Sequence, residues 1–172
     1  MASVLPENYV SFWDFSLQQY ARPGVADVCL QLQDQHAVNV NLLLWCVWLE
    51  RRGLVLNQER LGEAQQRIQA WDEHYVVPLR QLRRRMKTEF GLADAGIEQV
   101  RHQIKQAELL AEKQVQKQLE SVAENWRDTA SDAPLSAGHN LVFYLQEYKV
   151  NDFSRVVSLL AQGGMPESPN GK

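Results

Sequence analysis

The sequence has few of the residues and motifs from which catalytic or metal sites are usually recognised. Cys29 and Cys46 are the only cysteines in 172 residues, and both lie within apolar runs, which is typical of small buried thiols rather than of disulfides or metal ligands. The four histidines are scattered, without His-x-x-x-His spacing, and Gly-x-Ser-x-Gly, a phosphate-binding glycine loop and Asp-Asp-x-x-Asp are all missing. The commonest hydrolase, kinase and isoprenoid signatures are therefore excluded, and we predict no catalytic, cofactor-binding or metal-binding residue.

Long apolar runs and an excess of positive charge are also lacking. The longest apolar run, Leu42 to Leu49, has eight residues, whereas a membrane-spanning helix needs about 20. The first residues show neither the basic segment nor the apolar segment of an export signal, so a cytoplasmic protein with no membrane partner is expected. A net charge of -3 disfavours a general nucleic-acid binder.

Strand-like alternation is almost absent, and apolar residues instead recur at helical spacing. The run from Leu42 to Leu49 is apolar on every side, so it predicts a central helix that other helices must surround. We therefore expect an all-α fold, a single-domain bundle of about seven or eight helices over residues 8–162. Residues 163–172 contain two prolines and little to bury, which is typical of a disordered tail.

Capping and turn residues predict where these helices begin and end. Asn39 or Asn41 is expected to cap the central helix, Gly53 to end it, and Asn57 to begin the next one. Pro78 predicts a kink or a fresh start within a longer helical pattern. Three further signals are Ser11 and Ser136 as caps, and Pro23 in the first turn of a helix.

The longest element is expected from Asp94 to about Trp126, because no proline and almost no glycine interrupts the helical pattern there. At about 1.5 Å per residue it would reach ~50 Å, longer than a compact domain of this size requires, so part of it is expected to project or to pair. Its apolar stripe is predicted to contain Ile97, Val100, Ile104, Ala107, Ala111, Val115, Leu119, Val122 and Trp126.

The segment after Pro78 carries a basic stripe beside an apolar face. Arg80, Arg83, Arg84 and Lys87 lie within an arc of roughly 100°, next to the arc of Leu79, Leu82, Met86 and Phe90. The stripe has three interpretations: a solvated face paired with carboxylates of the same chain, a surface for an acidic protein, or a nucleic-acid contact. Trp71 and Trp126 lie near segment ends, where a half-exposed indole can join a docking surface.

Several of these residues together resemble a family of small bacterial proteins known only as a domain of unknown function. The resemblance covers residues from about 8 to 160 and implies a shared helical fold in a bacterial cytoplasm, without an activity, a cofactor or a site residue. The residues that carry it are Phe12-Trp13-Asp14-Phe15-Ser16 with Tyr20, the segment Asn41 to Leu49, Trp71, Val77-Pro78-Leu79-Arg80, Asn140-Leu141 and Tyr144-Leu145.

The leading functional hypothesis is a non-enzymatic protein-interaction module or adaptor, with a dimer as one option, whose docking surface includes the long helix, the basic stripe, Trp71 and Trp126. The partner is expected to be another protein or a second copy. Two alternatives stay open. One is an enzyme or small-ligand binder with a pocket near Trp71, Asp72, His74 and Tyr75, and the other is a nucleic-acid-associated protein that uses the basic stripe.

Overall fold

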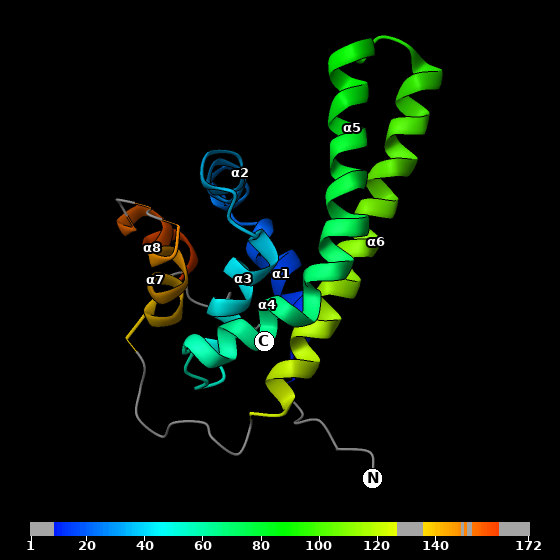
Figure 1. The fold of residues 1–172 in the computed structure, drawn as a ribbon. Coiled ribbons are helices and arrows are strands. Elements are labelled where there is room, and N and C mark those ends of the chain that lie inside the picture. Colours follow the sequence, from blue (N-terminus) through cyan, green and yellow to red (C-terminus); the bar gives the residue numbers. More distant parts are fainter. Residues whose placement is uncertain (1–8, 127–135, 149, 151–152, 162–172) are drawn as a thin grey trace, which may run out of the picture. The chain divides into compact units, whose positions relative to one another are not determined.

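The computed structural model describes residues 9–126, 136–148, 150 and 153–161, and within these residues all regular structure is helical (Figure 1). The predicted all-α class is confirmed, including the one long helix. The elements are α1 (Phe12–Tyr20), α2 (Val25–His36), α3 (Val40–Glu50), α4 (Gln58–Trp71), the π-helical turn η1 (Asp72–Val76), α5 (Val77–Phe90), α6 (Ala95–Glu124), α7 (His139–Gln146) and α8 (Ser154–Leu160).

These elements belong to two compact units, which we describe separately. The first unit contains Met1–Asp14 and Asn57–Asp128, and thus α4, η1, α5 and α6. The second contains Phe15–Leu56 and Thr129–Lys172, and thus α2, α3, α7 and α8, so the chain passes between the units inside α1. A single domain over 8–162 stays a prediction, and the expected tail, 163–172, lies outside the described residues.

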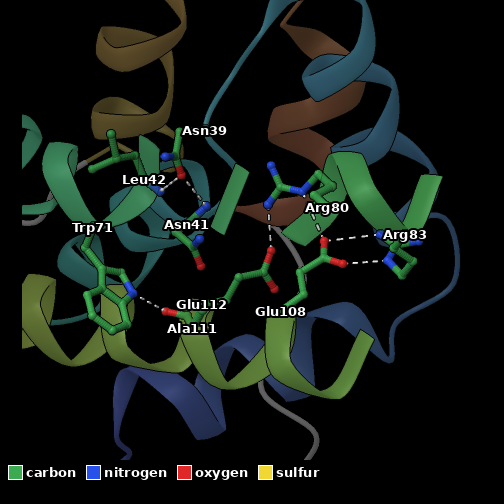
Figure 2. Close-up of polar contacts among 9 residues, drawn as sticks. All are labelled: Asn39, Asn41, Leu42, Trp71, Arg80, Arg83, Glu108, Ala111 and Glu112. Carbon is green, nitrogen blue, oxygen red and sulfur yellow. Dashed lines mark hydrogen bonds and ion pairs between the residues drawn. The ribbon is translucent and has the colours of Figure 1, made fainter. Parts of the chain in front are cut away.

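The core of the second unit is α3, the predicted central helix. Asn39 is its N-cap, because its side-chain oxygen accepts hydrogen bonds from the backbone N–H groups of Asn41 (3.0 Å) and Leu42 (3.4 Å) (Figure 2). Every residue from Asn41 to Leu49 is buried, as the uniformly apolar run predicts. Cys29 and Cys46 are both free and buried, and burial raises the pKa of the Cys29 thiol to about 12.

Helix α7 is attached by two polar side chains to the end of α3 and to the segment that follows it. The Glu50 carboxylate, at the end of α3, accepts hydrogen bonds from the backbone N–H groups of Gly138 (2.9 Å) and Asn140 (2.7 Å). The buried Asn140 amide accepts from Leu56 N (2.8 Å) and donates to Leu54 O (2.8 Å). The expectation that the Ser136 side chain caps this helix was wrong, because the helix begins at His139 and the carboxylate comes from Glu50, far away in the sequence.

Most other predicted helix ends are confirmed. Ser11 Oγ accepts from Asp14 N (3.1 Å) at the start of α1, and Asn57 caps α4 through Arg60 N (2.9 Å). Asp94 caps α6. Pro23 was predicted inside the first turn of a helix, but α2 begins only at Val25, after Gly24 has turned the chain in the left-handed conformation (φ 80°).

In the first unit, α4 continues through η1 into α5, and α6 returns antiparallel beside α5 (Figure 1). The wider π turn ends just before Pro78, whose ring would clash with the carbonyl of the residue four positions earlier in a regular α-helix. The sequence predicted this interruption but not its form. None of the helices in the described part of the chain combines the length and the apolarity that a membrane span requires.

Candidate functional site

An ion-pair network joins α5 to α6 near the base of their hairpin (Figure 2). Glu108 of α6 is 5% exposed, and its carboxylate accepts hydrogen bonds from Arg80 Nε (3.2 Å) and Arg83 Nε (2.5 Å). Arg80 Nη2 also donates to Glu112 (2.7 Å), one turn further along α6. Two members of the predicted basic stripe are therefore held in the seam between the helices by carboxylates of the same chain.

Burial and charge together set the acidity of these groups. Burial alone would lower the pKa of Arg80, but the carboxylates of Glu112 and Glu108 outweigh it and raise that pKa. For Glu112 burial is the larger effect, so its pKa is raised although Arg80 acts to lower it. Burial likewise raises the pKa of Asp72, which feels the charge of Arg80 as well. The charges of Arg80 and Arg83 are thus compensated by carboxylates of the same chain, which agrees with the first interpretation of the stripe.

The aromatic residues at the end of α4 and in η1 precede this network in the sequence. Trp71 Nε1 donates a hydrogen bond to Ala111 O (3.0 Å), which ties the end of α4 to α6 (Figure 2). The Trp71 and Tyr75 rings are 4.5 Å apart between centroids, and His74 and Tyr75 are exposed. Within the described residues, no three side chains of His, Cys, Asp or Glu are grouped as a metal site requires.

We call residues 77–107 of the hairpin the arm. It consists of α5, the connection to α6 and the first part of α6, and none of its residues is buried. Arg84 and Lys87, the other two members of the predicted stripe, are exposed on it. Large apolar side chains are exposed there too: Phe90 (57%), Leu92 (54%) and Val100 (53%), while Leu110 (69%) lies just beyond on α6.

The apolar stripe predicted for α6 is wrong at two positions. Val100 and Ala107 were expected in it, but both are exposed, whereas Glu108 occupies a buried position in the seam. The stripe is correct from Ala111 to Trp126, where α6 packs beside α4. Glu108 and Glu112 were not predicted as site residues. They are four residues apart, so both can lie on one face of α6. Their contacts with Arg80 and Arg83, however, depend on how α5 and α6 are aligned along their axes, which the sequence does not show.

Trp126 does not reach the surface on which it was predicted. It is only 7% exposed, its Nε1 donates to Glu63 (3.2 Å), and the Arg60 guanidinium lies 4.9 Å from its ring centroid. Trp71 is half-buried. The structure thus keeps both indoles in contacts of the first unit, and the exposed surface of the arm is formed by other residues.

These features define a class: an all-helical protein with a long antiparallel hairpin whose distal part lies open to solvent. Residues 11–119 match the model of the protein family of unknown function DUF2390, and the chain belongs to that family. This confirms the resemblance found in the sequence. The matched residues include α3 and the whole arm, and they end before α7. Comparisons with curated proteins and with solved structures gave no significant match.

Proposed function

We propose that the protein is a helical protein-interaction module, or adaptor, whose docking element is the arm of residues 77–107. One observation carries the proposal: 31 consecutive residues include none that is buried, yet they form the whole of α5 and the first part of α6, with large exposed apolar side chains. Helices gain most of their stability in proteins by packing an apolar face. Exposed apolar surface of this kind is typical of an interaction site.

The charges of the arm support a protein partner over a nucleic acid. Arg80 and Arg83 are already neutralised by Glu108 and Glu112, which leaves fewer cations for phosphate contacts. The exposed apolar residues Phe90, Leu92 and Val100 add the kind of surface that buries well against another protein. We also infer a bacterial cytoplasmic setting, which the two free, buried cysteines support.

Site-specific photo-crosslinking in cells tests the proposal. A photoreactive amino acid replaces Gln103, which is exposed on the arm, or Gln31, which is exposed on α2 and serves as the matched control. From position 103 we expect crosslinks to one defined protein, either a different protein or a second copy of this chain. From position 31 we expect none. Purified components must then reproduce the binding, and Val100→Ser must weaken it. An arm position that crosslinks no more than the control contradicts the proposal.

A further inference from the structure

The network at the base of the hairpin shows which residues of α5 and α6 lie level with each other. Glu108 binds both Arg80 and Arg83, so it lies level with the α5 positions between them. Because the helices are antiparallel, moving one residue towards the C-terminus of α5 corresponds to moving one residue towards the N-terminus of α6. Lys87 is therefore about level with Gln103. The ion pair between Arg80 and Glu112 agrees with this alignment.

The arm has two different sides. Arg80 and Lys87 lie on one side of α5, which is the side of Glu98 and Glu112 on α6 and the side of the ion pairs. At about 100° per residue, Arg85 and Glu89 lie within roughly 40° of each other on the opposite side of α5. On α6, Val100 and Ala107 lie within roughly 20° of each other, away from Glu98 and Glu112. This second side thus combines exposed apolar residues with one exposed cation and one exposed anion.

We propose that the partner of the arm is a second copy of this chain, and that the two arms pair antiparallel through this second side. The inference rests on the proposed function and names its partner. A two-fold axis level with Lys87 places Arg85 against Glu89 of the second copy, and Glu89 against Arg85. Such reciprocal contacts are what an isologous interface requires. The same axis, level with Gln103 on α6, places Val100 against Ala107 of the second copy.

The remaining exposed apolar residues fall within the same overlap. The axis brings the tip of one arm, near Asp94, level with Arg80 of the other, an overlap of about 14 residues or ~20 Å along each helix. Leu92 then lies level with Leu82 of the second copy, and Leu110 level with Ile97. One symmetry operation thereby brings Leu92, Val100 and Leu110 within the length of the overlap, and it produces a four-helix arrangement of a common kind.

Charge exchange tests the pairing, with sedimentation velocity of the full chain as the measurement. We expect wild-type protein to be dimeric at about 100 µM, and Arg85→Glu or Glu89→Arg to weaken dimerisation at least about tenfold, because each change creates two like-charge contacts. The double variant R85E/E89R restores opposite charges across the axis, so its dimerisation should return to within about threefold of wild type. Lys105→Glu, an exposed charge reversal on the other side of the arm, should leave it unchanged.

Three results overturn the inference. One is a wild-type chain that stays monomeric at every concentration, another is a dimer that ignores both single changes, and the third is a double variant that fails to recover. Circular dichroism establishes that each variant is folded, and Val100→Ser gives a second route to dissociation without a change of charge. A monomer that still crosslinks to another protein through Gln103 would end the inference and leave the proposed function standing.

Discussion

Glu108 is the residue that holds the base of the arm together. It is almost fully buried and accepts hydrogen bonds from Arg80 and Arg83 at once, so its neutralisation removes the carboxylate that binds Arg83 and leaves Arg80 with Glu112 alone. We expect Glu108→Gln to lower the free energy of unfolding by about 2–3 kcal/mol, measured by urea unfolding. Glu98→Gln, which removes a solvent-facing pair with Arg101 on the same helix, is the control and should change stability far less. Equal effects of the two changes would contradict this role of Glu108.

Asp72 makes stability depend on pH. Its pKa is raised above 3.8 in the folded protein by burial, so the folded state binds this proton more tightly than the unfolded state. The contribution to stability is present below 3.8 and is lost as the pH rises through the folded pKa. In Asp72→Asn this titration is gone. The stability of the variant relative to wild type should therefore be highest at about pH 7 and fall as the pH is lowered towards about 4, in urea unfolding at each pH. A relative stability that does not vary with pH would be inconsistent with this assignment.

The sequence could predict single residues only where their role is local. Asn57 and Asp94 cap helices through backbone groups two or three positions away, so their side chains and spacing were sufficient evidence. For the central helix the same local signal left Asn39 and Asn41 as candidates, and the structure shows that Asn39 is the cap. The basic stripe was different. Its arc on the helix was visible, but Arg80 and Arg83 are bound by carboxylates that lie on α6, and no local pattern contains that information.

At the scale of elements, the start of α7 depends on the absence of a side chain. Gly138 has φ +83°, and a Cβ there would lie 2.8 Å from Val157 Cγ1. Gly138→Ala should therefore lower the free energy of unfolding by about 2–4 kcal/mol, through backbone strain and overpacking. Gly62, exposed within α4, is the matched control because a Cβ added there would meet no atom within 4 Å, and Gly62→Ala should raise stability by about 0.5–1 kcal/mol. Thermal or urea unfolding that gives both changes the same sign would refute the argument.

Element type was predicted well because helical periodicity is a strong signal over long segments, as in α3 and α6. The beginning of α7 was missed because Glu50 acts across a large separation in sequence, as the carboxylates that bind Arg80 and Arg83 also do. The exposed positions Val100 and Ala107 show the third limit. Both residues continue the apolar spacing of α6, so the sequence predicted that they are buried. The side of α6 that is buried there depends on where α5 packs, and the buried residue is Glu108.

At the scale of the whole molecule, burial is distributed unevenly along the chain. In α3 every residue from Asn41 to Leu49 is buried, whereas the 31 residues of the arm include none. Regions with little buried apolar surface open locally at a low free-energy cost, while core elements open only with global unfolding. The protein therefore has a stable core helix and a helical arm whose stability is expected to depend on what it contacts.

Hydrogen exchange read by mass spectrometry can test this division and the pairing of arms in one experiment. In dilute protein, amides of the arm should exchange at least about 100-fold faster than those of α3, because no residue of the arm is buried and the arm therefore opens at a lower free-energy cost than α3. Raising the protein concentration should slow exchange in the arm and leave α3 unchanged, since a partner that binds only the closed arm stabilises it by mass action. Arg85→Glu should abolish the concentration dependence without altering exchange in α3. Arm amides protected as strongly as those of α3 in dilute protein would show that the arm is stable alone, and the argument from its exposure would then fail.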